Sequence, residues 1–251
     1  MKSKEEDSRS FEALASIIYS PNNVIHSKTA VNSDDIPRGQ ITSKHCAASA
    51  LNDELKTIKR RTLIAALKQG MTMKTDLVAI CDGAPNCWNV IKVFEKKCRS
   101  ITRILDWFHI AKKFQNISLG DQLSKILSNI KWCIWHGQTK KGLSRFDSII
   151  NQTKDSKTKD RLMKLKNYLI DNEDYLINYA KRYNSGKIIS SSIAESNIEN
   201  LINKRCKGKQ HMQWSRYGVH PLLQIRASYA SKDWYYFGSQ YVLKATTQIA
   251  A

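Results

Sequence analysis

The sequence contains no uninterrupted run of about 18 apolar residues, the least that a membrane-spanning helix needs, so we expect no membrane partner. Its first nine residues are charged and carry no apolar stretch of the secretory-signal kind. None of its six cysteines belongs to a C-x-x-C pair or to a Cys/His cluster with zinc spacing. These absences exclude a disulfide framework and a structural zinc, and they favour a reducing, cytoplasmic location.

Acidic residues are scarce as well. The chain has 22 Asp and Glu against 41 Lys and Arg, a formal net charge of +19. Such an excess of positive charge suits a polyanionic partner. Nucleic acid is the first candidate and an anionic membrane surface the second, although a basic surface without any such partner would have the same net charge. With 251 residues, 41% of them hydrophobic, the chain is long enough for one domain carrying a large insertion.

Apolar patterning predicts an α/β fold. The apolar run at 77–81 has the length of a strand buried on both faces, and a similar run lies at 101–105. The helical pattern at 88–98 between them completes a strand–helix–strand unit. Further strands are expected at 11–19 and 45–48, with a loop from about 20 to 43, and a helix is expected at 51–70.

The pattern becomes fully helical and rich in lysine from 110 to about 183, and Ser185-Gly186 then interrupts it. Further helices are expected at 188–204 and 221–229. This order predicts three parts: a core segment at 10–109, an all-helical insertion at 110–186, and C-terminal core helices at 187–238.

Two acidic residues follow the paired strands. Asp82 comes directly after the first apolar run, and a carboxylate at the carboxyl end of a parallel strand points into the crevice where α/β sheets place their sites. An ordinary turn aspartate beside Gly83 is the alternative. Asp106 follows the next strand, with His109 three residues later, so both side chains can face the same crevice. Alternatively, Asp106 caps the next helix and His109 merely packs on it.

A third acid, Glu195, lies in a helix that begins with three serines, whose small side chains would let the helix lie close to a sheet. Glu199 follows four residues later, and a solvated glutamate pair is the alternative interpretation. Three carboxylates around one crevice would hold two magnesium ions for phosphoryl transfer, because magnesium prefers hard oxygen ligands.

Basic and aromatic residues alternate near the C-terminus, a combination that suits phosphates and stacked bases. The alternative is a helix pair whose Trp214 belongs to the core. The candidate DNA-binding residues are Lys204, Arg205, Lys207, Trp214, Arg216 and Arg226.

Five ordered motifs together resemble bacterial insertion-sequence transposases, most closely those of the Kra-type elements. They are ICDGA at 80–84, ILDWFH at 104–109, AES at 194–196, WSRYG at 214–218 and LQIR at 223–226. The likeness extends from about residue 9 to 238. It implies a ribonuclease-H-like mixed sheet with a large helical insertion, two Mg²⁺ ions, and DNA strand cleavage and transfer at element ends, with catalysis by acids of the DDE type.

The resemblance makes Asp82 and Glu195 the second and third metal-binding acids. It matches Asp106 and His109 to a D-x-x-H signature that orders the site or the scissile DNA. It also implies a homo-oligomer that binds element ends and target DNA near the bacterial nucleoid. Another ribonuclease-H-like nuclease, such as a resolvase, is disfavoured by the long helical block between the acids.

The first acid of that family lies on a central strand that precedes the strand at 11–19. Residues 1–9 are too polar for such a strand, and Asp34 and Asp35 lie in a loop. We therefore expect an N-terminally truncated, catalytically deficient transposase whose first strand is lost or supplied by an upstream fragment. A DNA-binding or oligomerising remnant without chemistry is the alternative.

Overall fold

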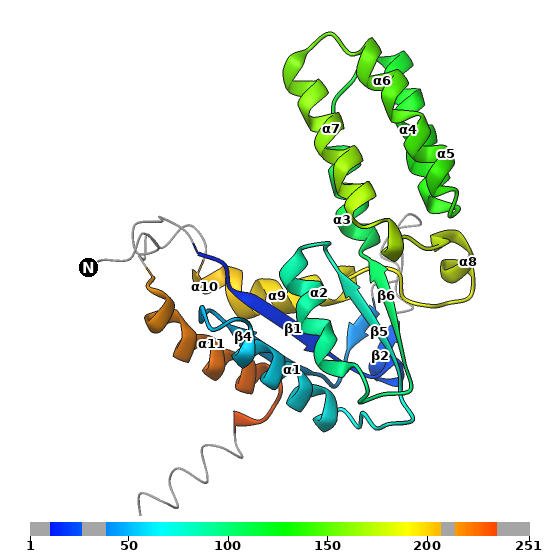
Figure 1. The fold of residues 1–251 in the computed structure, drawn as a ribbon. Coiled ribbons are helices and arrows are strands. Elements are labelled where there is room, and N and C mark those ends of the chain that lie inside the picture. Colours follow the sequence, from blue (N-terminus) through cyan, green and yellow to red (C-terminus); the bar gives the residue numbers. More distant parts are fainter. Residues whose placement is uncertain (1–10, 27–38, 207–213, 235–251) are drawn as a thin grey trace, which may run out of the picture. The chain divides into compact units, whose positions relative to one another are not determined.

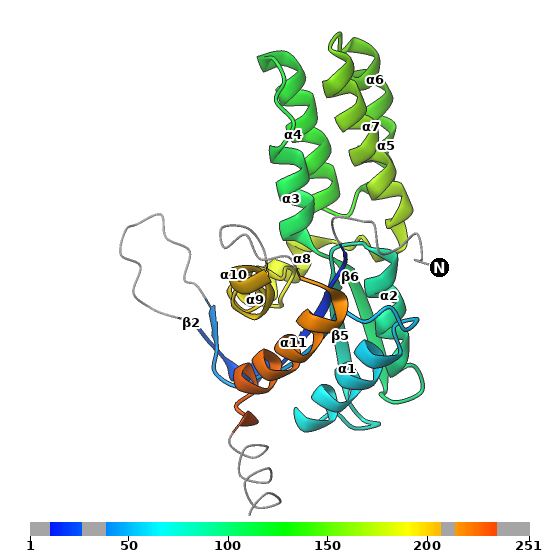
Figure 2. The same cartoon turned by 90° about the vertical axis from the view of Figure 1, so that its left-hand side faces the viewer.

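A computed structural model of the protein describes residues 11–26, 39–206 and 214–234. These residues form a mixed α/β protein in which helices predominate and the strands pair two by two (Figures 1 and 2). The chain divides into two compact units. The first unit comprises Met1–Thr75, Asn89–Arg99 and Ile193–Ala251, and the second comprises Asp76–Trp88 and Ser100–Ser192.

Two antiparallel strand pairs belong to the first unit. β1 (Leu14–Ile18) pairs with β4 (His45–Ser49), which confirms the strands expected at 11–19 and 45–48. β2 (Val24–His26) pairs with β3 (Gly39–Ile41), so the loop predicted between 20 and 43 is wrong at these positions. Three-residue strands are too short to produce the alternation of apolar and polar residues by which a strand is detected. The short helix η1 (Pro21–Asn23) connects β1 to β2.

β4 is the centre of this unit because helices cover both of its faces. α1 (Lys56–Lys68) and α11 (Arg216–Ala230) both pack against it. Successive side chains of a strand point to opposite faces, so Ala47 meets Ile58 of α1 while its neighbours meet α11 and the helical segment before it. The neighbours of Ala47 and the helical residues that they meet form the β4–α11 cluster. Its buried residues are Cys46, Ala48, Ala50, Leu201, Ile202, Val219, Leu223 and Ala227.

The outer edge of β4 is satisfied by side chains of the same helical region. Gln224 Nε2 donates to the Ala48 carbonyl at 2.9 Å, and the Cys46 amide donates to Ser231 Oγ at 2.8 Å. Because a buried strand edge must find partners for its polar groups, these bonds end the sheet at β4. On the other side, β1 pairs with no strand but β4 in the described part of the chain.

Several helix boundaries differ from the sequence prediction for local reasons. α1 begins at Lys56 rather than at 51, because Glu54 and Leu55 have φ angles of 55° and 66°, which a right-handed helix does not accept. α11 begins at Arg216 rather than at 221, with Ser215 Oγ capping it by accepting from the Gly218 amide at 3.0 Å. Pro221 lies inside this helix, whose buried face outweighs the lost backbone bond.

The helix predicted at 188–204 is divided into three segments. α9 (Ser192–Ile198) continues as the π-helical turn η4 (Glu199–Asn203) and ends in α10 (Lys204–Cys206). A π turn shifts the backbone bonding by one residue, and it leaves some carbonyls without their usual helical partners. Arg226 of α11 donates hydrogen bonds to two of these carbonyls, those of Asn200 and Leu201.

His220 on α11 makes the stability of the first unit sensitive to pH. Its Nδ1 lies 3.4 Å from the Ala50 amide, and burial followed by the charge of Arg61 lowers its pKa, outweighing the opposite effect of Asp53. A folded-state pKa below the unfolded value of about 6.5 means that acid favours the unfolded chain. The stability contribution is therefore complete above about pH 6.5 and is lost as the pH falls below it.

Replacement of His220 by glutamine, which retains an acceptor and does not titrate, is expected to flatten this pH dependence. Urea midpoints measured between about pH 7.5 and 5.5 should fall less in His220→Gln than in the parent protein. Parallel pH curves for the two proteins would contradict the role given to His220.

The second unit begins with a parallel strand pair. β5 (Asp76–Cys81) and β6 (Ser100–Leu105) confirm the strands expected at 77–81 and 101–105. The crossover contains α2 (Pro85–Ile91) and the 3-10 turn η2 (Lys92–Phe94), so the helix predicted at 88–98 starts and ends earlier, with proline at its favoured first position. The expected burial of the first strand on both faces is wrong, since Val78 is 45% exposed. An apolar run alone does not reveal whether a second face is covered.

The remainder of the second unit is helical, as the sequence predicts for 110–183. The helices α4 (Asp121–Trp135), α6 (Phe146–Gln152) and α7 (Ser156–Asp171) lie side by side (Figures 1 and 2). One core joins these helices to β6: Ile104 and Leu105 share a cluster with Ile130, Phe146 and Leu169. The helices are α3 (Trp107–Gln115), α4 (Asp121–Trp135), α5 (Thr139–Ser144), α6 (Phe146–Gln152), α7 (Ser156–Asp171), η3 (Glu173–Tyr175) and α8 (Tyr179–Asn184). Within the described ranges, none of the helices has the length and apolar character needed to cross a membrane.

Candidate active site

Asp82 and Asp106 lie at the same edge of the parallel strand pair. Cys81 stands opposite Leu105 in the register of β5 and β6, so the next residue of each strand is an aspartate. The Asp106 amide donates to the Cys81 carbonyl at 2.8 Å, which extends the ladder by one more bond. The carboxyl edge of a parallel sheet is where α/β proteins place their sites, and the sequence prediction of two neighbouring acids is confirmed in this respect.

The carboxylate of Asp82 is exposed. Its Oδ1 accepts from the Ala84 amide at 3.0 Å, as in the tight turns that aspartate commonly forms. Its backbone carbonyl accepts from the Tyr168 hydroxyl at 2.8 Å. The turn interpretation is therefore confirmed, and the functional interpretation of the exposed Asp82 carboxylate stays a prediction.

Asp106 is in the opposite situation, because its side chain is 1% exposed and surrounded by donors. Oδ1 accepts from the amides of Phe108 and Ser191, each at 3.0 Å. Oδ2 accepts from His109 Nδ1 at 2.6 Å and from Ser191 Oγ. Asp106 is thus the N-cap of α3, and it also fixes the segment that leads into α9. Its lone pairs are used by the protein, so it is an anchor and a poor candidate for a metal ligand.

His109 is held by this anchor. With Nδ1 donating to the Asp106 carboxylate, the neutral ring places its lone pair on Nε2. The side chain is 35% exposed and meets the Phe108 ring edge-on at a centroid distance of 5.5 Å. A histidine oriented in this way can accept a proton or a hydrogen bond through Nε2, and it can donate from that atom once protonated.

Glu195 lies in the first turn of α9 and is half-buried. It belongs to the first unit, whereas Asp82, Asp106 and His109 belong to the second. The approach of Glu195 to Asp82 therefore stays a prediction. Glu199, the other member of the pair, is exposed at the start of the π turn, where its Oε2 accepts from Asn203 Nδ2 at 2.8 Å.

Two of the candidate DNA-binding arginines are engaged with the backbone of the first unit. Arg226 donates through Nε to the Leu201 carbonyl at 2.8 Å and through Nη2 to the Asn200 carbonyl. Both carbonyls belong to the π turn, so Arg226 compensates for its irregular bonding. Arg216 donates through Nη1 to the Ala50 carbonyl at 3.2 Å and lies 5.2 Å from the Phe11 ring centre.

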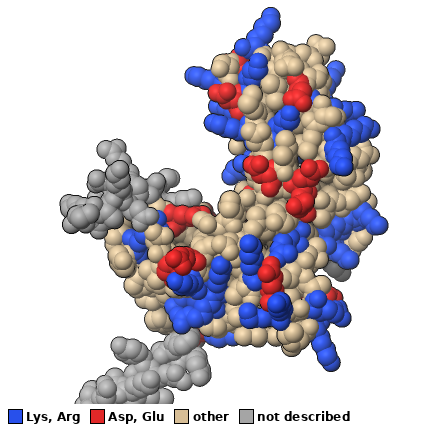
Figure 3. Space-filling view, viewed as in Figure 1, with Lys and Arg blue, Asp and Glu red and all other residues tan. Residues whose placement is uncertain are grey.

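The other members of that set differ in their surroundings. Trp214 packs against the β4–α11 cluster, in agreement with the core alternative, and the Arg205 guanidinium lies 6.0 Å from its ring centre. Lys204 is exposed on α10. Lys207 lies outside the described residues, as do Asp34 and Asp35. On the face in Figure 3, Lys and Arg are spread widely and interspersed with Asp and Glu rather than gathered in one patch.

Because Arg226 completes the π turn, its replacement is expected to affect stability more than DNA binding. Arg226→Gln should lower the free energy of unfolding by about 1 to 3 kcal/mol, the usual range for losing a charge-assisted bond. Lys204→Ala, at an exposed site of the same predicted DNA-binding set, should change stability by less than about 0.5 kcal/mol. Urea unfolding measures both changes, and equal effects would contradict the assignment.

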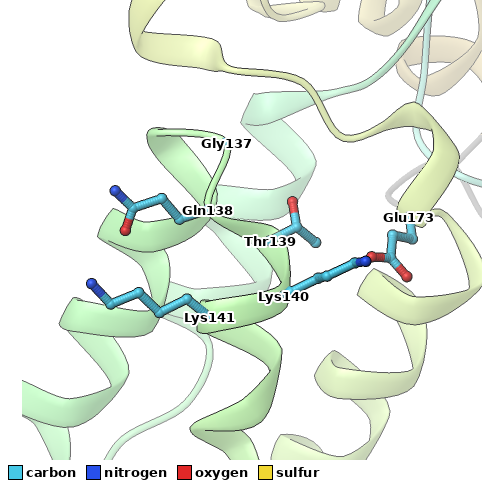
Figure 4. Close-up of a pocket in the computed structure, with 6 residues that line it drawn as sticks. All are labelled: Gly137, Gln138, Thr139, Lys140, Lys141 and Glu173. Atoms are coloured by element: carbon cyan, nitrogen blue, oxygen red, sulfur yellow. The ribbon is translucent and has the colours of Figure 1, made fainter.

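Sequence reasoning missed three residues around the strand ends: Ser191, which binds Asp106, and Tyr168 and Asn172, which contact the turn after β5. The residues around them in the sequence do not indicate these contacts, because Asp106 lies 85 residues before Ser191 and Asp82 lies 86 residues before Tyr168. The shallow depression of Figure 4 contains none of the candidate residues. It is lined by Gly137, Gln138, Thr139, Lys140, Lys141 and Glu173.

Comparison of the chain with models of protein families, with curated proteins and with solved structures gave no match. The functional assignment therefore depends on the residues themselves and on their geometry.

Proposed function

We propose that the chain belongs to a DDE-type insertion-sequence transposase with a ribonuclease-H-like core and a helical insertion. One observation carries the proposal: two adjacent parallel strands end in Asp82 and Asp106 at the same edge of the sheet. The helical block α3–α8 follows β6 directly, and Glu195 comes after it on α9, in the order that the sequence resemblance implies. DNA at the element ends and at the target is the proposed partner, bound by a homo-oligomer.

The donor set suits magnesium in part. Asp82 offers an exposed carboxylate of which one oxygen accepts a single turn bond, and hard oxygen ligands are those that Mg²⁺ prefers. Glu195 on α9 is the proposed second carboxylate, as the sequence resemblance implies. When bound, the ions would activate the attacking water or 3′-hydroxyl and stabilise the leaving oxygen.

Asp106 and His109 have a supporting role in this proposal. The saturated Asp106 carboxylate fixes the first turn of α3 and the backbone at Ser191. His109 is oriented by the Asp106 carboxylate, and its proposed role is to help order the scissile DNA, as the sequence resemblance implies.

No strand of the described residues carries the first acid of that family. In the family this acid lies on a central strand next to β1 and β5, yet in the described part of the chain β1 pairs with β4 and β5 with β6, and with no further strand. We propose that activity requires a strand carrying this aspartate, and that residues 1–251 tested alone are catalytically deficient.

Cleavage of DNA tests this proposal. The full chain, incubated with Mg²⁺ and DNA carrying the element ends, should give no nicking above background. Addition of a peptide or fragment encoded just upstream should restore nicking, and Asp82→Asn should abolish the restored activity because one metal ligand is lost. Robust nicking by the unaltered chain alone would refute the deficiency, and nicking that survives Asp82→Asn would refute the site.

A non-catalytic DNA-binding function is the second candidate, favoured by the net charge of +19 and by the sheet topology. It predicts binding whose affinity falls linearly with salt on logarithmic axes, because phosphate contacts release counterions. Binding should persist in an Asp82→Ala, Glu195→Ala double variant. Fluorescence anisotropy of labelled DNA measures the salt dependence of the affinity and the binding of the double variant. Loss of binding in a folded double variant would contradict this candidate.

Lys204 is an exposed member of the predicted DNA-binding set. Lys204→Ala should reduce the logarithmic salt slope by about one, whereas Lys92→Ala on η2, also exposed, should leave it unchanged. Equal slopes for Lys204→Ala and the parent protein would remove α10 from the DNA-binding surface.

A further inference from the structure

The turn between β5 and α2 has a conformation that few sequences accept. Gly83 has a φ of +95°, a value that side chains of L-residues rarely adopt. A Cβ atom at this position would lie 2.8 Å from Tyr168 Cε2 and 3.0 Å from Asn172 Nδ2. The end of α7 and the residue that follows it therefore lie directly on the backbone of the turn, with no room for a side chain between them.

A hydrogen bond fixes the same turn from the same side. The Tyr168 hydroxyl donates to the Asp82 carbonyl at 2.8 Å. Burial raises the pKa of Tyr168, and the negative charge of Asp82 raises it further, so the hydroxyl keeps its proton and remains a donor. The Lys113 ammonium lies 4.3 Å from the centre of the Tyr168 ring and helps to hold that ring in place.

Asn172 connects the turn to the helix that follows it. Its side-chain oxygen accepts from Trp88 Nε1 at 3.0 Å, and its side-chain nitrogen donates to the Tyr168 carbonyl at 3.0 Å. The Trp88 ring also meets Tyr175 at a centroid distance of 4.0 Å. Asn172 is 4% exposed, so these bonds form away from solvent and tie α2 to the end of α7.

We propose that Tyr168 and Asn172 are positioning residues for Asp82. The turn is clamped from α7, more than 80 residues further along the chain, and this clamp keeps the Asp82 carboxylate exposed at the strand edge while its backbone is immobilised. A metal ligand held in one orientation binds its ion without the entropic cost of ordering the loop. The inference rests on the proposed function insofar as Asp82 is a metal ligand, whereas the clamp itself is a property of the folded chain.

Amide hydrogen exchange tests the clamp without reference to metal. Tyr168→Phe removes only the hydroxyl, and we expect exchange at residues 82–84 to quicken by up to about tenfold, the equivalent of one lost hydrogen bond. Tyr183→Phe, the same change at an exposed tyrosine of α8, is the matched control and should leave exchange at these residues unchanged. Unchanged exchange in a folded Tyr168→Phe protein would overturn the proposal.

Manganese binding, followed by electron paramagnetic resonance of the full chain, then separates the two proposals. If Asp82 is a ligand, Asp82→Ala should abolish binding, and Tyr168→Phe should weaken it several-fold while the unfolding midpoint changes little. Binding unaffected by Asp82→Ala would refute the ligand role of the proposed function, and exchange at residues 82–84 would still decide the clamp. Weakened binding with unaltered exchange would count against the clamp.

Discussion

Replacement of Asp106 by alanine is expected to lower the free energy of unfolding by about 3 to 5 kcal/mol, which is a large part of the stability of an ordinary domain. The carboxylate accepts from the amides of Phe108 and Ser191, from the Ser191 hydroxyl and from His109 Nδ1. Because the side chain is 1% exposed, its removal leaves these donors without an acceptor in a place that water reaches poorly.

Asp147 provides the control for this prediction. It belongs to the same unit, is 67% exposed and pairs with Lys166 at 2.6 Å, so Asp147→Ala should cost less than about 1 kcal/mol. Denaturant unfolding monitored by circular dichroism gives both values. If Asp106→Ala cost no more than Asp147→Ala, the anchoring role of Asp106 would be wrong, and its carboxylate would again be a candidate metal ligand.

The second large effect is expected at Gly83. Gly83→Ala should destabilise the protein by about 2 to 5 kcal/mol, because the left-handed backbone costs about 1 to 2 kcal/mol and overpacking adds about 1 to 3. The new methyl group would meet side chains of Tyr168, Asn172 and Leu105 at 3.0 Å or less. Tyr168 and Asn172 bond to their neighbours, so they cannot simply move aside.

Gly186 separates the two contributions. It lies in the same unit with a φ of +67°, and a Cβ there would meet nothing within 4 Å. Gly186→Ala should therefore show the backbone cost alone, about 1 to 2 kcal/mol. The difference between the two variants, measured by urea unfolding, gives the packing cost of the turn. Equal losses would mean that α7 does not press on Gly83 as the structure indicates.

The strand ends could be predicted from the sequence because their signals are local. An apolar run of strand length followed by Asp82-Gly83 marks both the strand and the turn, and a second run followed by Asp106 marks its neighbour. The helical character of 110–183 was visible for the same reason, since its apolar faces recur within one or two turns. The hairpin of β2 and β3 was not visible, because three residues hold too little periodicity.

The roles of individual polar residues could not be predicted in this way. Arg216 and Arg226 belong to a basic, aromatic segment that indicates DNA binding, yet their guanidinium groups bond carbonyls at Ala50 and in the π turn. Sequence patterning counts such charges as surface, because it contains no information about which distant carbonyl lacks a partner.

The α/β class, the two strands that end in acids, the helical block and the basic charge can all be predicted from the residues alone, because each depends on composition or on neighbours within a few residues. Contacts in the folded chain are needed to show that Asp106 is a buried anchor for Ser191 and His109 and that Asp82 remains exposed on a turn held by Tyr168. Those differences arise from contacts between segments that lie far apart in sequence, where burial and the supply of hydrogen-bond donors determine what each carboxylate can do.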